Sequence, residues 1–232
     1  MSYIQEFLSK ENFEKLQEIM YSKNVKTGNY LFWEGDESDR LYFIKSGKAK
    51  LKKSTEEGKD LILSIMNKGD LLGEFGGTSR MYHGYSAEVV EDVELGIIQL
   101  KDLEILLYQF GDFAVEFLHW VGLMNRIIQS KFRDLLLYGK SGALASTLIR
   151  LSNTYGVPCA DQTKINIKLT NTEIADFIGM TRETVNRLLN AWKEEGILSI
   201  KNGYIYIERM NDLKKICKCP SYPSCPKEIC RI

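Results

Sequence analysis

Four cysteines near the end of the chain have the clearest capacity for chemistry. They are Cys217, Cys219, Cys225 and Cys230, within the stretch CKCPSYPSCPKEIC. In a cytosolic protein, closely spaced thiols point to metal or redox chemistry rather than to a disulfide framework. Prolines flank them, and a Cys-Pro pair is a feature of iron–sulfur loops. The pattern favours an iron–sulfur site. Zinc or another thiophilic metal, a redox disulfide, or no site are the alternatives.

The rest of the chain offers little for catalysis. Its two histidines, His83 and His119, are far apart, whereas a metal-centred oxygenase needs a cluster of histidine and carboxylate ligands. No serine or cysteine pairs with a histidine as a nucleophile would, and there is no glycine-rich phosphate loop. The sequence therefore predicts that the protein is not an enzyme.

A second informative stretch, Thr170 to Leu198, has the pattern of a helix-turn-helix. Thr170 and Glu173 can form a capping box, Gly179 can take the left-handed conformation of a turn, and Thr181 can cap a second helix. Apolar residues three and four apart give both helices an inward face. These are Ile174, Ala175, Phe177 and Ile178 in the first helix, and Val185, Leu188, Leu189 and Trp192 in the second.

The outward face of the second helix suits DNA. Arginine fits the paired acceptors of guanine, glutamate accepts from cytosine, and asparagine pairs with adenine or a phosphate. The chain has a net charge of +0, so binding would come from this local patch. The alternative is a solvated face, but the cap, turn and apolar pattern all agree on a DNA-reading helix. The predicted DNA-binding residues are Thr181, Arg182, Glu183, Asn186 and Arg187.

The N-terminal part has a different pattern of apolar and polar residues. Apolar residues at helical spacing predict short helices within residues 3–22. From 24 to 100, short alternating runs are separated by glycines at intervals typical of an antiparallel barrel or jelly roll. We therefore expect an α+β protein with an N-terminal β-barrel sensor domain.

A long helix should connect the barrel to the helix-turn-helix. It is expected to start at about Asp102 or Asp112 and to end at Leu137. Its two apolar stripes predict one contact with the barrel and another with the same helix of a second copy. Gly139 and Gly142 then predict a hinge.

A turn signal after the helix-turn-helix, Asn202-Gly203, predicts a hairpin that forms a wing. Together these elements predict four parts. They are a β-barrel sensor domain in 1–110, a dimerisation helix in 111–138, a winged helix-turn-helix domain in 139–214 and a cysteine-rich tail in 215–232.

This order of parts resembles the CRP/FNR family of transcription regulators over essentially the whole chain. The block TRETVNR is similar to the recognition helix of that family. The resemblance implies that Arg182, Glu183 and Arg187 read bases, with Asn186 as a flanking contact. Having Arg182 before Glu183 resembles the CRP version, which implies half-sites of TGTGA type. Double-stranded DNA and a second copy of the chain are the expected partners.

Cyclic-nucleotide members of the family have a Gly-Glu pair followed about ten residues later by Arg-Ser. Here Gly73 and Glu74 are present, but Tyr85 stands before Ser86. An aromatic ring cannot replace a guanidinium as a bidentate phosphate partner, and Arg80 is out of register. We therefore expect that cyclic AMP is not the effector. The alternative regulator carries a small organic effector in the barrel.

The stretches CPKEIC and Ser130 to Val157 resemble a branch of FNR regulators from Gram-positive bacteria. That branch carries a [4Fe–4S] cluster on a C-terminal tail, held by three cysteines and one aspartate. In that branch the spacing is Cys-x2-Cys-x4-Cys, but here five residues separate the first pair, so a fourth cysteine stays open as an alternative ligand. By position the ligands are Cys219, Cys225, Cys230 and Asp134, with Cys217 as the alternative.

Asp134 also lies where the helix seam would place an apolar residue. The alternatives to metal binding are a pair with Arg133 or Lys131 of a neighbouring chain, or a solvated helix end. We expect an oxygen-responsive regulator that binds a palindromic site as a homodimer while its cluster is intact. The loop Val157 to Thr163 matches a region of CRP that touches RNA polymerase, the further expected partner. Neither a signal peptide nor a membrane-spanning run is recognisable, so we expect a cytoplasmic protein.

Overall fold

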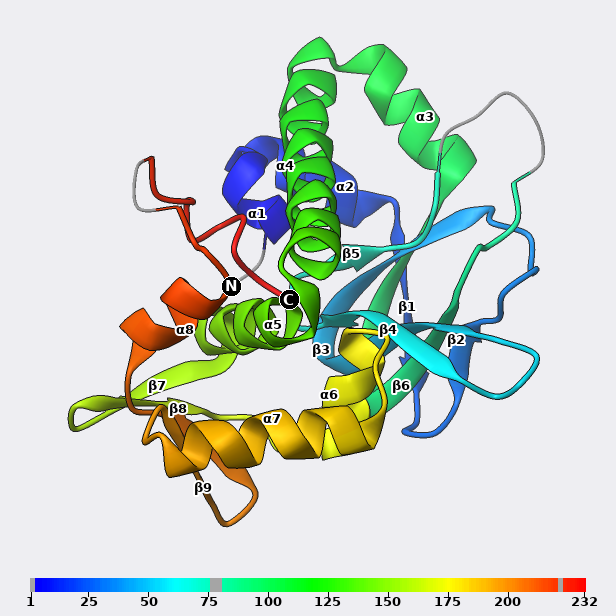
Figure 1. Cartoon of the computed structure of the whole chain (residues 1–232). Coiled ribbons are helices and arrows are strands. Elements are labelled where there is room, and N and C mark those ends of the chain that lie inside the picture. Colours follow the sequence, from blue (N-terminus) through cyan, green and yellow to red (C-terminus); the bar gives the residue numbers. More distant parts are fainter. Residues whose placement is uncertain (1–2, 76–80, 221–222) are drawn as a thin grey trace. The chain divides into compact units, whose positions relative to one another are not determined.

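The structure is a computed structural model that describes residues 3–75, 81–220 and 223–232. The chain forms two compact units, Met1–Leu123 and Met124–Ile232. One helix, α4 (Gly111–Leu137), runs from the first unit into the second (Figure 1). Both units combine helices with an antiparallel sheet, which confirms the predicted α+β class. Within the described ranges, none of the helices has both the length and the apolar character needed to cross a bilayer.

The first unit is built around a six-stranded antiparallel sheet. Its central path is β1-β6-β3-β4, with β2 paired to β6 and β5 paired to β3. Two helices lead in: α1 (Tyr3–Phe7) and α2 (Lys10–Glu18). The strands are β1 (Met20–Val25), β2 (Tyr30–Phe32), β3 (Arg40–Ser54), β4 (Asp60–Met66), β5 (Leu71–Leu72) and β6 (Ser86–Gln99).

The lead-in helices were expected, but the strands begin earlier than the sequence pattern indicated. Met20 follows a helical spacing, yet it opens β1 and pairs with Ile98 of β6. Continuous pairing of β1 with β6 outweighs the local helical pattern, because propensity is a weak prior against tertiary context.

The two long strands bend where their pairing register shifts. At Gly47 the backbone is left-handed, with φ +82°, and a Cβ would lie 2.0 Å from the carbonyl oxygen of Asp92. Only glycine fits this close approach. The bend lets β3 and β6 each pair with several partners and enclose an apolar core. That core includes Phe32, Tyr42, Ile44, Leu51, Leu72, Val89, Val93, Leu95 and Ile97.

The long helix is interrupted near its expected start. A separate helix, α3 (Leu100–Gln109), ends at Phe110, whose backbone is extended, and α4 begins at Gly111. The start near Asp112 is therefore correct and the start near Asp102 belongs to α3. Phe113, Phe117 and Trp120 are buried, which confirms one of the two predicted apolar stripes.

The second unit contains the end of α4, four further helices and a four-stranded sheet of order β7-β8-β10-β9. The helices are α5 (Gly139–Tyr155), α6 (Asn171–Phe177), α7 (Arg182–Glu194) and α8 (Met210–Ile216). The strands are β7 (Gly156–Cys159), β8 (Gln162–Ile165), β9 (Leu198–Lys201) and β10 (Tyr204–Ile207). Neither α8 nor the β7–β8 hairpin was expected from the sequence pattern.

The predicted hinge is only partly correct. Gly139 has a left-handed backbone with φ +61° and marks the turn after α4. Gly142 lies inside α5, where a Cβ would come 2.2 Å from the Cβ of Tyr138. Gly142 is therefore a close packing position rather than part of a hinge.

The helix-turn-helix and the wing match the sequence prediction closely. Thr170 and Glu173 form both hydrogen bonds of a capping box, and the side chain of Thr181 caps α7. In the β9–β10 hairpin, Asn202 and Gly203 both have positive φ, as a type I′ turn requires. Short-range side-chain and turn chemistry accounts for these features.

A buried histidine lies in the first unit. The ring of His83 stacks on Phe32 with 3.6 Å between centroids, and its Nδ1 lies 3.3 Å from Oε2 of Glu74. Burial lowers the pKa of His83, while contact with Glu74 and the more distant Asp36 and Asp39 act in the opposite direction. The net effect favours the neutral imidazole.

This lowered pKa predicts a pH-dependent stability. Because the unfolded chain binds a proton at His83 more readily than the folded chain, the free energy of unfolding should fall as pH drops below about 6.5. Melting curves between about pH 7.5 and about pH 5 should show a smaller pH dependence in His83→Gln than in the wild type.

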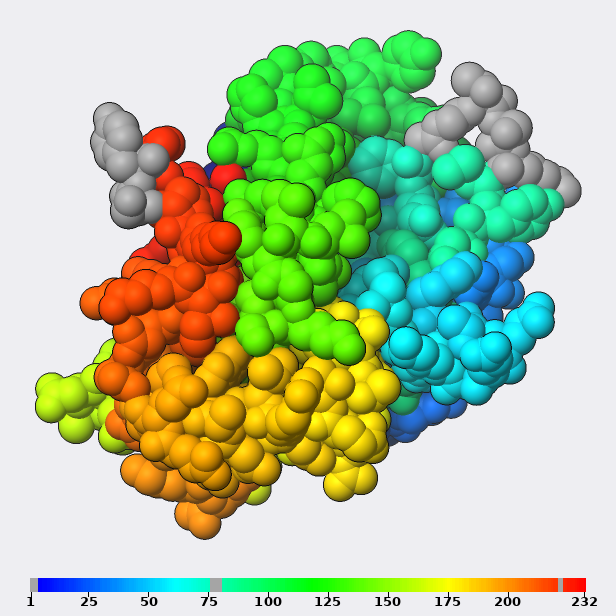
Figure 2. All heavy atoms as spheres, in the orientation of Figure 1, coloured from blue at the N-terminus to red at the C-terminus, as the bar shows by residue number. Residues whose placement is uncertain are grey.

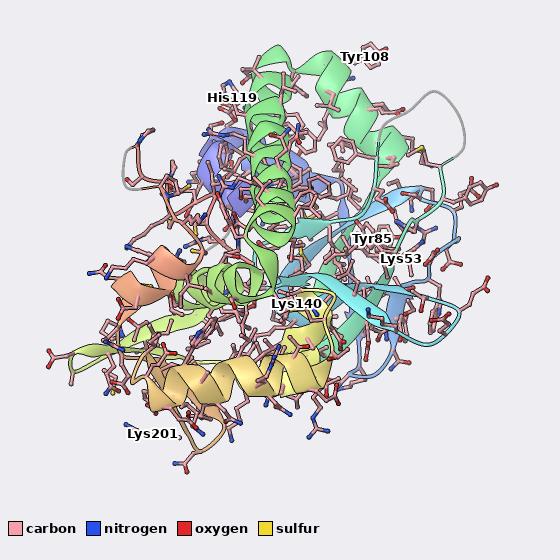
Figure 3. The ribbon with its side chains drawn as sticks, in the orientation of Figure 1. Lys53, Tyr85, Tyr108, His119, Lys140 and Lys201 are labelled. Atoms are coloured by element: carbon pink, nitrogen blue, oxygen red, sulfur yellow. The ribbon has the colours of Figure 1, made fainter. Side chains whose placement is uncertain are left out.

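The other histidine provides a matched control. His119 is exposed and points outward from α4 (Figure 3), so His119→Gln should keep the wild-type slope. Equal slopes for wild type and His83→Gln would contradict the buried, neutral imidazole.

Candidate metal centre and DNA interface

The four tail cysteines and Asp134 line one pocket of the second unit. Asp134 comes from α4, Ser146 and Arg150 come from α5, and the cysteines come from the segment that follows α8. Figure 1 shows this segment returning from α8 toward the point where α4 meets α5. The structure thus brings together every predicted ligand, including the alternative Cys217.

Two short turns place the cysteines. At the end of α8, Lys218 has a left-handed backbone and the amide of Cys219 donates to the carbonyl of Lys214 at 2.8 Å. Further on, the amides of Ile229 and Cys230 donate to the carbonyl of Pro226 at 3.1 and 3.3 Å. Each turn changes the chain direction, so thiols from both ends of the tail reach the same pocket.

Asp134 is an ion-paired carboxylate. Its Oδ1 accepts from Arg133 Nη2 at 2.7 Å, and its Oδ2 accepts from Arg150 Nη2 at 2.6 Å. The hydrogen bond that Arg133 donates to Asp134 in turn raises the pKa of Arg133. The pair with Arg133, one of the alternatives from sequence, is therefore formed, and Arg150 is an additional partner. Because each carboxylate oxygen has two lone pairs, Oδ2, which accepts one hydrogen bond, keeps a further site at which it could bind a metal.

The tail thiols differ in burial, because Cys217 is buried and the other three are half-buried. Cys217 is 4% exposed, and burial raises its pKa to about 11, helped by the neighbouring Cys219 and Asp134. Burial also raises the pKa of Cys219 and of Cys230, although Arg150 acts in the opposite direction on Cys230. Because metals bind thiolates, metal binding here would release protons from these groups.

The donor set fits an iron–sulfur cluster in its chemistry. No three histidine, cysteine, aspartate or glutamate side chains of the described residues stand in a ready metal-binding geometry. The pocket nevertheless offers four soft thiols next to the guanidinium groups of Arg133 and Arg150. Nε of Arg150 is buried and has no acceptor within the described ranges. A thiolate-held cluster is negatively charged and accepts hydrogen bonds at sulfur, so these cations complement it.

The predicted DNA-contacting residues all lie at the start of α7. Arg182, Glu183 and Arg187 are exposed, and Figure 2 shows the surface of α7 open along one face. Thr181 caps the helix through the amide of Thr184. Asn186 is half-buried and its side-chain carbonyl accepts a hydrogen bond from Asn171 of α6, so its flanking contact with DNA stays a prediction.

The structure adds a basic and aromatic patch that the sequence analysis missed. Nζ of Lys164 lies 3.8 Å and Nζ of Lys168 5.1 Å from the ring centroid of Tyr204, and Nζ of Lys201 lies 5.2 Å from that of Tyr206. Lys201 is beside the turn of the wing (Figure 3). The signal was the alternation in YIYI, which places both tyrosines on one face of β10.

In the sensor unit, Glu74 has a structural partner. Its Oε2 accepts from the amide of Gly84 at 2.8 Å. Tyr85 lies within the sheet domain (Figure 3), 5.8 Å from Phe32 between ring centroids, and burial raises the pKa of its hydroxyl. Arg80 lies outside the described residues. That cyclic AMP is not the effector stays a prediction.

Comparisons with known proteins agree with this architecture. A family model described as a cyclic nucleotide-binding domain matches residues 22–109, and one described as a Crp-like helix-turn-helix domain matches residues 142–216. An anaerobic regulatory protein of Bacillus subtilis (strain 168) is 42% identical over 229 residues, which cover 98% of this chain and 95% of the relative. A fumarate and nitrate reduction regulatory protein of Yersinia pestis is 29% identical over 217 residues, covering 92% and 85%.

A solved structure shows a similar fold. It is a CooA mutant from Carboxydothermus hydrogenoformans, with a TM-score of 0.76 and 19% identity. The match covers 94% of this chain and 96% of the other. At this identity the likeness concerns the fold alone.

The geometry predicts a graded reactivity of the thiols. Cys159 is exposed at the end of β7, whereas Cys217 is buried. With iodoacetamide under reducing, metal-free conditions, Cys159 should be alkylated at least about tenfold faster than Cys217, as measured by mass spectrometry of peptides. In denaturant the two rates should converge. Similar rates in the folded protein would contradict the burial of Cys217.

Proposed function

Because the chain belongs to the CRP/FNR family of transcription regulators, whose members bind DNA and are not enzymes, we propose that it regulates transcription in response to oxygen. It binds a palindromic TGTGA-like site as a homodimer when a [4Fe–4S] cluster is intact. The relatives named for anaerobic regulation support this sensing role.

The observation that carries the proposal is the convergence of the tail thiols beside α4 and α5. Cys219, Cys225, Cys230 and Asp134 are the proposed ligands, with Cys217 as the alternative, and all of them line one pocket. When bound, the cluster supplies oxygen-labile bonds that link the tail to this pocket. The residues of α5 hold the end of the tail, so a change in the tail would act on this helix of the second unit.

The second half of α4 supports the homodimer. Ile128, Phe132 and Leu136 are 66%, 64% and 64% exposed, and they follow one another at intervals of four residues. Such a stripe of large apolar side chains favours burial against a second helix. A twin copy of α4 would place two recognition helices at adjacent half-sites.

Two surfaces of the second unit complete the proposal. The exposed residues of α7 would read bases, while the lysines Lys164, Lys168 and Lys201 would contact phosphates without regard to sequence. The hairpin formed by β7 and β8, which includes the predicted segment Val157 to Thr163, is exposed along β7 and is the proposed contact for RNA polymerase.

A second candidate function has its own observation. The first unit has an open groove beside Tyr30 and Trp33, whose rings stack at 3.5 Å between centroids, with Lys52 and Ser86 in its lining. This groove favours a regulator with a small organic effector in the sensor domain. In that case the tail binds zinc or forms a redox disulfide, although all five cysteines are free thiols in the described structure.

Anaerobic purification tests the cluster. We expect a brown protein with about four iron and four sulfide per chain, bleached by air. By fluorescence anisotropy, its affinity for a palindromic TGTGA duplex should be at least about tenfold higher than that of the metal-free protein. The exposed cysteine provides a control, since Cys159→Ser should behave as the wild type. Equal affinity with and without iron would rule out the proposed sensing.

Ligand variants belong to the same experiment. Cys225→Ser and Asp134→Asn should each lose iron, whereas Cys217→Ser should keep it. Iron retained in Asp134→Asn and lost in Cys217→Ser would instead assign the fourth ligand to Cys217. Since Asp134→Asn also removes the ion pair with Arg150, its melting temperature must be measured in parallel.

Variants in the DNA-binding unit separate base contacts from phosphate contacts. Arg182→Ala should weaken binding to the specific site by about 1–3 kcal/mol and relax the preference at one base pair. Lys201→Ala should weaken binding to all duplexes and reduce the slope of log K against log salt by about 1. Titrations at several salt concentrations measure both. An unchanged base preference in Arg182→Ala would contradict the assigned role.

A further inference from the structure

The end of the tail is held to α5 by hydrogen bonds that do not involve any thiol. We propose that Arg150 and Asn153 are positioning residues that fix the backbone around Cys230, so that its thiol is presented to the pocket before a metal binds. This inference rests on the proposed function, because positioning the thiol matters only if a cluster binds. The hydrogen bonds that Arg150 and Asn153 donate to the tail, here called the clamp, are made by the protein chain without a metal.

Arg150 is the centre of this clamp. It is 3% exposed, and its Nη1 donates to the carbonyl of Ile229 at 2.9 Å and to that of Arg231 at 3.2 Å. Its Nη2 donates to Oγ of Ser130 at 2.9 Å and to Oδ2 of Asp134 at 2.6 Å. One guanidinium therefore joins α4, α5 and the tail within the second unit. Figure 2 shows the tail lying against these helices.

The next turn of α5 forms hydrogen bonds with Cys230 and Ile232. Nδ2 of Asn153 donates to the carbonyl of Cys230 at 2.8 Å. The amide of Ile232 donates to Oγ1 of Thr154 at 3.2 Å. The carbonyls of three successive residues, from Ile229 to Arg231, thus accept from side chains of one helix.

All the acceptors in the tail are backbone carbonyls, so the clamp leaves the Cys230 thiol available. Cys230 lines the pocket while its peptide is fixed on both sides. A ligand that is ordered in advance lowers the conformational entropy lost on binding. The clamp should therefore increase the affinity of the site for a metal without being a ligand.

The clamp also determines which part of the tail stays attached when a cluster is lost. The last residues, Ile229–Ile232, stay attached to α5 through bonds that do not depend on a metal. The segment that loses its anchorage is the one around Cys219 and Cys225, which has no such set of hydrogen bonds to α5 in the described structure. Loss of a cluster should therefore leave Ile229–Ile232 held to α5 rather than detach the whole tail.

Thiol reactivity in the full-length protein tests the clamp. The protein is treated with chelator and reductant, and iodoacetamide alkylation of each cysteine is followed by mass spectrometry. In Asn153→Ala, alkylation of Cys230 should be about tenfold faster than in the wild type, and in both Asn153→Ala and Arg150→Gln hydrogen exchange of the last peptide should lose its protection. An unchanged Cys230 rate and unchanged exchange in both variants would overturn the proposal.

Arg133→Gln is the matched control. Arg133 donates to the same carboxylate, Asp134, but its guanidinium has no hydrogen bond to the tail carbonyls Ile229–Arg231 in the described structure. Its Cys230 rate should stay within about twofold of the wild-type rate. A tenfold increase in this control would attribute the effect to the ion pair and overturn the positioning role. If Arg150→Gln does not fold, Asn153→Ala decides alone, since Asn153 is only half-buried.

A measurement of iron retention distinguishes this proposal from the proposed function. After anaerobic reconstitution, Asn153→Ala should retain less iron than the wild type during dialysis against a chelator. Wild-type protein that takes up no iron would overturn the oxygen-sensing function, while the alkylation result would still decide whether the clamp exists. Faster alkylation together with wild-type iron retention would overturn the positioning role and leave the sensing function intact.

Discussion

The buried ion pair between Arg150 and Asp134 is the interaction on which the second unit depends. Its two charged atoms lie 2.6 Å apart, and both side chains are almost completely removed from water. A buried charge is costly unless it is paired, and removal of one partner typically destabilises a protein by about 3–5 kcal/mol. The pair therefore requires α4, α5 and the tail to keep one arrangement, because the same guanidinium also binds tail carbonyls.

In that arrangement, the atoms that attach the tail are not the atoms that could bind a metal. Backbone carbonyls attach the tail, while thiols and one carboxylate remain as donors for a metal. The carboxylate of Asp134 is shared between two possible partners, a guanidinium or a metal. A carboxylate is a hard ligand and binds iron less firmly than a thiolate does, so this position is suited to exchange. Such exchange would change how the end of α4 is held relative to α5.

The family models describe parts of the two units but not the tail cysteines. In the first unit, Glu74 holds Gly84 and contacts His83, so its carboxylate supports the sheet. In the second unit, the DNA-binding elements follow the general pattern of the family model. The tail cysteines lie beyond the matched region, which ends at residue 216. The proposed sensing site is therefore an addition to the family fold.

The sequence alone determined the features that arise from short-range chemistry. The capping box at Thr170, the cap at Thr181 and the Asn202-Gly203 turn depend on neighbours a few residues away. The tertiary structure decided the rest. Arg150 lies in an apolar helix, 16 residues from Asp134 and 79 from Ile229, so no local spacing indicates either partner. Ion pairs between distant residues depend on how helices pack, and that packing is set by the whole fold.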